Sequence, residues 1–127
     1  MPHGSHRSVL VVDDEPILRL FACEALEEAG YEVVGASSAD EAIALLRGGT
    51  PFFGAVLTDI EMPGNLDGLE LAWNIQAHWP EITVIVTSGR KLPRADEIPR
   101  AASFLPKPFS AERLVDTMRG SSTAGQK

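Results

Sequence analysis

Short apolar runs that alternate with helix-sized segments constrain the fold of this chain more than any other feature. Three such runs stand at 9–12, 55–58 and 82–86. Strands covered on both faces lose the alternation of inward and outward residues, so unbroken runs are typical of buried parallel strands. Their alternation with helices predicts βαβ units with right-handed crossovers. We therefore expect an α/β fold with helices on both faces of a parallel sheet.

Proline, glycine and capping residues set the expected helix boundaries. Ser38 and Glu41 have the spacing of a capping box, and Gly30 is expected to end the preceding helix. In that first helix Ile17, Leu20 and Phe21 fall on one side, while Arg19, Glu27 and Glu28 can face water. The expected helices span 17–29, 39–46, 68–78 and, after the cap Ser110, 111–119.

Length, charge and cysteine content limit the class of protein. The 127 residues suit one domain, placed at 8–119, with flexible termini at 1–7 and 120–127. No segment has the roughly 18 apolar residues of a membrane span. A net charge of −7 without a basic stripe argues against direct nucleic-acid binding. The single cysteine, Cys23, agrees with a reducing cytoplasm.

Charged side chains follow the ends of three expected strands. Asp13 and Asp14 follow the first, Asp59 follows the run at 55–58, and Lys107 follows a run at 102–105. In open parallel sheets ligands bind at the carboxyl ends of the strands. Crowded carboxylates repel one another unless a cation lies among them, and an all-oxygen set favours Mg²⁺ over zinc.

Such a site has the groups needed to form an aspartyl phosphate. With Mg²⁺ bound, one of the carboxylates can attack an electrophilic phosphorus while the metal neutralises the phosphoryl oxygens. Lys107 can pair with another of these oxygens. Thr87, at the end of a neighbouring strand, can donate a hydrogen bond to a third.

These residues together resemble the receiver domains of bacterial two-component response regulators. The motifs that match, in order, are Asp13-Asp14, Asp59 with Met62-Pro63, Thr87, and Lys107-Pro108. The resemblance implies a flavodoxin-like, doubly wound sheet of five strands in the order 2-1-3-4-5. It also implies a phosphorylation-controlled signalling module rather than an enzyme, with at most slow self-phosphorylation and self-dephosphorylation.

The resemblance also implies a role for each matching residue. Asp59 would accept a phosphoryl group from a sensor histidine kinase or a phosphotransfer protein, and a downstream protein partner is possible. Asp14 would bind Mg²⁺ directly, Asp13 mainly through water, and Glu61 through its backbone carbonyl. Thr87 and Phe104 would move together as a switch, and the peptide bond before Pro108 would be cis.

The chain departs from the receiver pattern at three places. The turn from Met62 to Gly68 is one residue longer than usual. Between Thr87 and Lys107, where receivers have a fourth helix, Pro93 and Pro99 leave room for little more than one turn, so we expect that helix to be short, displaced or missing. Pro106 cannot donate to a sheet, so its strand must lie at an edge.

Two other functions remain open from the sequence. A pseudo-receiver would bind partners without phosphorylation, and the interrupted fourth helix is the feature that favours it. A phosphohydrolase with an aspartyl-phosphate intermediate would resemble haloacid dehalogenases, but these have an Asp-x-Asp pair and usually a cap domain. Here the pair Asp13-Asp14 is adjacent, and we see no segment for a cap.

Overall fold

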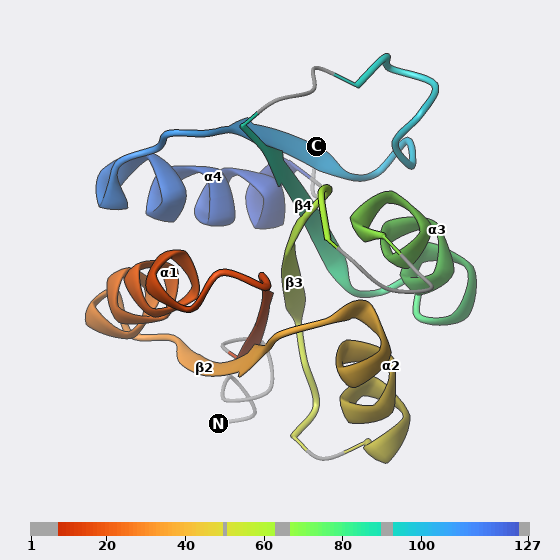
Figure 1. Ribbon diagram of the computed structural model, residues 1–127, viewed down its shortest axis with the longest axis horizontal. Coiled ribbons are helices and arrows are strands. Elements are labelled where there is room, and N and C mark those ends of the chain that lie inside the picture. The colour runs from red at the N-terminus through yellow and green to blue at the C-terminus, as the bar shows by residue number, and fades with distance from the viewer. Residues whose placement is uncertain (1–7, 50, 63–66, 90–92, 125–127) are drawn as a thin grey trace.

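A central parallel sheet with helices on both faces forms the body of the molecule (Figure 1). The computed structural model describes residues 8–49, 51–62, 67–89 and 93–124. The elements are β1 (Ser8–Val12), α1 (Pro16–Glu28), β2 (Glu32–Ala36), α2 (Ala39–Gly48), β3 (Ala55–Asp59), α3 (Gly68–His78), β4 (Thr83–Ser88), β5 (Ser103–Pro106) and α4 (Ala111–Ala124).

The sheet has the order β2-β1-β3-β4-β5, and every neighbouring pair is parallel. This confirms the predicted doubly wound fold. The strand order reverses between β1 and β3, and in such sheets the ligand site lies beyond the strand ends at that point. The register places Val12 beside Thr58 and Asp59 beside Thr87, so the polar residues after these positions meet at one edge.

Two apolar clusters hold the helices to the sheet. On one face α1 and α4 pack on Val9, Leu57 and Ile85, and on the other α2 and α3 pack on Leu10 and Val56 (Figure 1). Full burial of such a side chain contributes about 1.5–3 kcal/mol, so both layers hold the strand ends firmly in place. Among the described residues no helix is long and apolar enough to cross a membrane.

The buried face of α1 differs from the predicted one. Ile17, Leu20 and Phe21 are 81%, 57% and 39% exposed, and the buried stripe is instead Ala22, Ala25 and Leu26. Small alanine side chains let the helix approach the sheet closely, which turns the larger residues of the neighbouring stripe outward. Arg19, predicted to face water, is only partly exposed.

Two predicted helix ends also need correction. Ser38 accepts a hydrogen bond from the Glu41 amide, but the Glu41 carboxylate returns to Ser37 rather than to Ser38, so the predicted capping box is only half formed. The helix α4, predicted to end at Arg119, continues through Gly120 to Ala124. A single helical glycine costs about 1 kcal/mol and does not by itself stop a helix, so α4 runs five residues past its predicted end. The flexibility predicted for 120–124 stays a prediction. Residues 1–7 and 125–127, also predicted to be flexible, lie outside the described residues.

The segment between β4 and β5 forms no helix in its described part, residues 93–102, as the two prolines predict. It extends away from the sheet and returns beside α3 (Figure 1). Ile98 packs against the core on the α2 and α3 face, and Pro99 is buried. Pro106 lies in β5, the last strand in the order of the described sheet, so the predicted edge position is confirmed.

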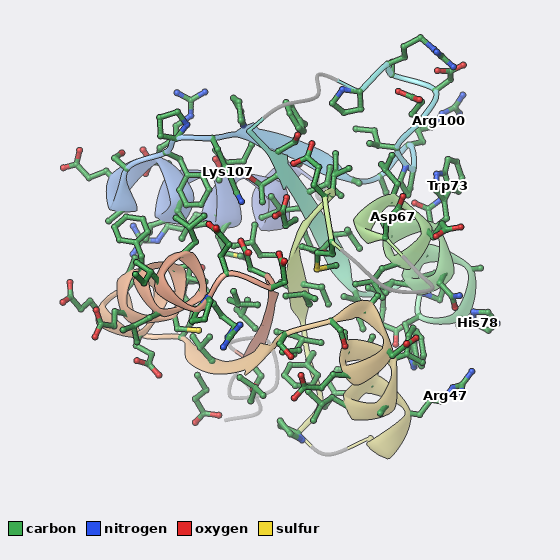
Figure 2. All side chains as sticks on the ribbon, in the orientation of Figure 1. Arg47, Asp67, Trp73, His78, Arg100 and Lys107 are labelled. Carbon is green, nitrogen blue, oxygen red and sulfur yellow. The ribbon has the colours of Figure 1, made fainter. Side chains whose placement is uncertain are left out.

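One side chain of α3 fastens this segment. The indole nitrogen of Trp73 donates a hydrogen bond of 2.8 Å to the carbonyl of Glu97, and Figure 2 shows Trp73 on the outer side of α3. Replacing Trp73 with phenylalanine removes the donor and keeps an aromatic ring. We expect a loss of about 1 kcal/mol in the free energy of unfolding and faster tryptic cleavage after Arg94 and Arg100.

Urea unfolding and timed trypsin digestion followed by mass spectrometry measure these two effects. The control is Trp79→Phe, because Trp79 packs against the core at the end of α3, where its backbone bonds to Ile75 and Ile82. Equal cleavage rates in wild type and Trp73→Phe would show that the indole hydrogen bond does not hold the segment.

Candidate metal and phosphoacceptor site

Three carboxylates meet where β1 and β3 end. Asp13 and Asp14 follow β1, and Asp59 is the last residue of β3. One carboxylate oxygen from each of the three lies within 4.8 Å of the others, so the structure brings together the three predicted acids. Asp13 and Asp59 are buried, at 6% and 4% exposure, while Asp14 is partly exposed.

Lys107 supplies the counter-charge. Its ammonium nitrogen lies 3.1 Å from Asp59 Oδ2 and 3.3 Å from Asp13 Oδ2. Figure 2 shows its side chain pointing from the end of β5 toward the middle of the molecule. Burial acts to lower the pKa of Lys107, but the charge of Asp13 and the hydrogen bond and charge of Asp59 outweigh it and raise the pKa. The lysine is therefore charged at neutral pH.

One lysine does not fully compensate the carboxylates. Burial raises the pKa of Asp59, the hydrogen bond and charge of Lys107 lower it, the charge of Asp13 raises it again, and the net pKa lies above the ordinary value. A buried acid with a raised pKa is a group whose charged form lacks stabilisation. The site therefore favours an added cation, and its all-oxygen ligands fit a hard divalent ion.

Thr87 has an unsatisfied hydroxyl at the same edge. It pairs in register with Asp59, its carbonyl accepts the Ile60 amide at 2.8 Å, and its side chain is buried. Among the described residues Thr87 Oγ1 has no hydrogen-bond partner. Leaving a buried hydroxyl unpaired costs about 1–3 kcal/mol, and this cost is explained if the hydroxyl is kept for a bound group.

The loop after β3 is tied to the site by its own backbone. The amide of Glu61 donates to Asp59 Oδ1 at 3.2 Å, and the Glu61 carboxylate accepts a 2.5 Å hydrogen bond from Ser88. The contact between Glu61 and Ser88 was not predicted, although a hydroxyl directly after Thr87 and an acid two residues after Asp59 were its visible signs. Most of the turn from Met62 to Gly68, which is one residue longer than usual, lies at 63–66, outside the described residues.

The helix α3 begins directly against the strand end. Asp67 and Glu70 form a complete capping box, with each side chain accepting from the other residue's amide. Gly68 touches the backbone of β3 so closely that an added Cβ would lie 1.7 Å from the Asp59 carbonyl oxygen. This glycine is required by the close approach of helix and strand.

An open cleft of about 580 Å³ lies at this edge of the sheet. Its walls include Asp14, Asp59, Glu61, Met62, Asp67, Gly89 and Lys107. A smaller apolar hollow of about 290 Å³ adjoins it between α1 and the start of α4, lined by Leu18, Phe21, Pro108 and Phe109 among others. The Lys107–Pro108 peptide bond is cis, the geometry that the resemblance implies.

Phe104 lies beside the site rather than in it. It pairs in register with Val86, is partly buried, and packs against the core on the α2 and α3 face. Its coupled movement with Thr87 remains a prediction.

The pKa of Asp59 predicts a pH dependence of stability in metal-free buffer. The ordinary aspartate pKa is about 3.9, and the folded value is higher. Between these two values the folded state holds more protons than the unfolded state, so the free energy of unfolding contributed by Asp59 falls as pH rises. Asp59→Asn should remove this slope.

Urea unfolding of wild type and Asp59→Asn at several pH values, with a chelator present, measures the difference between them. Taking the difference cancels the carboxylates common to both proteins. Asp96→Asn is the control, since the Asp96 side chain is 75% exposed. A difference that is flat or that rises with pH would contradict the raised pKa.

Comparisons with known proteins agree with this geometry. The family model of the response regulator receiver domain matches residues 9–119. The chain therefore belongs to the receiver domain family of two-component response regulators.

Relatives and solved structures give the same family. The chain is 40% identical over 115 residues to the C4-dicarboxylate transport transcriptional regulatory protein DctD of Rhizobium meliloti, covering 88% of this chain and 24% of that protein. It is 36% identical to the transcriptional regulatory protein FixJ of Azorhizobium caulinodans, covering 89% of this chain and 54% of that protein. A response regulator receiver protein from Sinorhizobium medicae superposes with a TM-score of 0.85 at 30% identity, covering 92% of this chain and 94% of the other. The chain thus spans between a quarter and about half of these two curated relatives.

Proposed function

We propose that this receiver domain accepts one phosphoryl group on Asp59 in the presence of Mg²⁺. The observation that carries the proposal is the position of Asp59, whose carboxylate lies between two further acids and the Lys107 ammonium, beside an unpaired threonine hydroxyl. Asp59 also faces the cleft, as does Asp14. Asp13 does not line the cleft, so it is the less accessible acid.

The reaction is an in-line displacement at phosphorus. An Asp59 oxygen forms the new bond to phosphorus, the bond from phosphorus to the donor's imidazole nitrogen breaks, and the electron pair stays with the imidazole. Asp13, Asp14, Asp59 and the backbone carbonyl of Glu61 would hold Mg²⁺, and the bound ion would supply positive charge to neutralise the phosphoryl oxygens. In this proposal Asp14 would bind Mg²⁺ directly, and Asp13 would bind it mainly through water.

Lys107 and Thr87 stabilise the product. The ammonium group that now contacts Asp59 would pair with a phosphoryl oxygen, because its two carboxylate partners can turn to the metal. The Thr87 hydroxyl would donate to another phosphoryl oxygen and so satisfy its own hydrogen bond. Movement of Thr87, with Phe104 following inward, would then report phosphorylation to the protein surface.

The donor would be a sensor histidine kinase or a phosphotransfer protein in the cytoplasm, and the output would be binding of another protein. The net charge of −7 disfavours direct contact with nucleic acid. Self-phosphorylation from small donors and self-dephosphorylation would be at most slow.

A pseudo-receiver that works without phosphorylation is the second candidate. The structural feature that favours it is the lack of a helix in residues 93–102, where receivers have a helix that serves for output. The two functions differ in their response to Asp59→Asn. Phosphorylation-controlled binding would change with acetyl phosphate in wild type and would not change in the variant.

The test is a mass measurement of the intact protein after incubation with acetyl phosphate and Mg²⁺. We expect the addition of one phosphoryl group, and its absence when a chelator removes the metal. An unchanged mass with Mg²⁺ present would contradict the proposal and favour the pseudo-receiver. Continuous release of phosphate from a phosphomonoester would instead indicate a phosphohydrolase.

A further inference from the structure

Arg19 contacts the backbone of the acidic site and not its cleft. It lies in the second turn of α1, and its Nη1 donates a 2.7 Å hydrogen bond to the backbone carbonyl of Asp13. Arg19 is partly buried and does not line the cleft. A guanidinium cannot bind a metal cation, so this side chain contributes to the site only through the backbone it holds or through its charge.

The strand β2 provides the space for this arginine. Gly35 faces the Arg19 stem, and a Cβ added at Gly35 would lie 3.2 Å from Arg19 Cδ and 3.5 Å from Nε. That separation is tighter than ordinary side-chain contact, so the missing side chain at Gly35 leaves room for Arg19 to pass. Arg19 and Gly35 thus form a matched pair.

Hydrogen bonds hold the Asp13 residue on its other sides. Its amide donates to the Ala36 carbonyl at 3.1 Å, and its Oδ1 accepts the Glu15 amide at 2.9 Å. The Asp13 carbonyl belongs to the peptide that joins Asp13 to Asp14. Among the described residues, Arg19 is the side chain that bonds to this peptide, and the contact restricts rotation of the peptide plane.

Asp14 depends on that peptide for its position. No hydrogen bond or ion pair holds the Asp14 carboxylate among the residues that the structure describes, yet one of its oxygens lies within 4.8 Å of those of Asp13 and Asp59. A partly exposed carboxylate without side-chain partners takes its direction from the backbone. A turn of the peptide between Asp13 and Asp14 would carry the Asp14 side chain out of the cluster.

We propose that Arg19 is a positioning residue for divalent-cation binding: by holding the Asp13 carbonyl it directs the Asp14 carboxylate into the site. This inference rests on the proposed metal site of the receiver. Groups that orient metal ligands in this way typically change metal affinity by about 10-fold to 100-fold when removed. The positive charge of Arg19 acts in the opposite sense, since it repels the cation.

These two effects give opposite signs and can be separated. Arg19→Met removes the charge and the donor while keeping most of the stem. If Arg19 acts through its charge alone, the variant binds Mg²⁺ more tightly. If Arg19 positions Asp14, the variant binds Mg²⁺ about 10-fold more weakly. Arg19→Lys keeps the charge and a donor without the planar fork, and should lie between wild type and Arg19→Met.

The experiment is calorimetric titration of the metal-free protein with MgCl₂ alone, with no phosphoryl donor. Thermal unfolding in a chelator reports any purely structural effect of each variant. Gly35→Ala should weaken Mg²⁺ binding in the same direction but less, because the added methyl displaces Arg19 by only a few tenths of an ångström. Arg47→Met, on the exposed end of α2, is the control and should bind as wild type does.

A second readout uses phosphorylation by acetyl phosphate at increasing Mg²⁺. We expect Arg19→Met to need about 10-fold more Mg²⁺ for half-maximal rate while its rate at saturating Mg²⁺ approaches that of wild type. If Arg19→Met does not fold, Arg19→Lys and Gly35→Ala carry the same test.

The outcomes separate this inference from the proposed function. Equal or tighter Mg²⁺ binding by Arg19→Met and Gly35→Ala overturns the role of Arg19 alone. Absence of Mg²⁺ binding in wild type overturns this inference together with the metal site. Weakened binding in the variants, with Asp59→Asn still phosphorylated, supports the role of Arg19 and rejects Asp59 as the acceptor.

Discussion

Asp59→Asn is expected to take up no phosphoryl group from acetyl phosphate, whereas wild type takes up one. The carboxamide keeps an oxygen that can accept the Glu61 amide, now 3.2 Å from Asp59 Oδ1, but it lacks a nucleophilic carboxylate oxygen. Lys107 keeps its 3.3 Å contact with Asp13. The variant should therefore fold and still lose the reaction.

Intact-protein mass spectrometry measures the uptake, and neutral hydroxylamine should remove the group because an acyl phosphate is labile to it. Asp96→Asn changes the charge equally at an exposed side chain and should be phosphorylated like wild type. Its melting temperature and that of Asp59→Asn show whether the fold is intact. Uptake by Asp59→Asn at the wild-type level would place the acceptor elsewhere, with Asp14 as the next accessible acid.

The alternation of apolar runs with helix-sized segments was enough to predict most of the fold. Strand ends in a parallel sheet share one edge, so the acids at 13, 14 and 59 could be placed together from the sequence alone. Pro106 predicted an edge position for β5 because proline lacks a donor, and β5 stands at the end of the strand order of the described sheet. These predictions succeed because they depend on backbone rules that side-chain packing does not override.

The predictions are wrong where side-chain packing decides which face of a helix is buried. Ile17, Leu20 and Phe21 form a helical stripe as regular as that of Ala22, Ala25 and Leu26, and apolar periodicity alone favours the larger residues. The alanine stripe is buried because the helix lies close to the sheet. The same rotation of α1 brings Arg19 toward Asp13, so one misplaced helix face concealed a residue that contacts the site.

Contacts between distant segments were also beyond sequence reasoning. Ser88 and Glu61 are 27 residues apart, and their positions next to Thr87 and near Asp59 do not by themselves predict that the two side chains meet. Trp73 and Glu97 are 24 residues apart, and their bond depends on the path of a segment that the prolines interrupt. In this chain α3 therefore bonds through Trp73 to the segment 93–102, where other receiver domains usually have a helix.

Gly68→Ala is expected to destabilise the protein more than a methyl group added at Gly35, Gly48, Gly49, Gly89 or Gly120. The added Cβ would lie 1.7 Å from the Asp59 carbonyl oxygen, 2.6 Å from its carbon and 2.8 Å from Ile60 Cα. All three neighbours are backbone atoms, so no side-chain rotation relieves the overlap. Overpacking in a well-packed interior costs about 1–3 kcal/mol and occasionally more, and we expect the upper end here.

Gly120→Ala is the matched control for this variant. Both glycines are helical, and a Cβ at Gly120 meets nothing within 4 Å. Alanine at this open position inside the helix should stabilise the protein by about 0.5–1 kcal/mol. Urea unfolding of the two variants therefore compares an added methyl group that clashes with one that does not.

We expect Gly68→Ala to impair phosphorylation at the site as well as to lower the stability of the protein. To make room for the methyl group, α3 must move away from the end of β3, and the loop that carries Glu61 must move with it. The Glu61 amide would then leave Asp59 Oδ1, so phosphorylation at low temperature should be slowed even while the variant is folded. A loss below about 1 kcal/mol with wild-type phosphorylation would mean that the helix and the strand end are not in rigid contact, and that the position of Asp59 does not depend on α3.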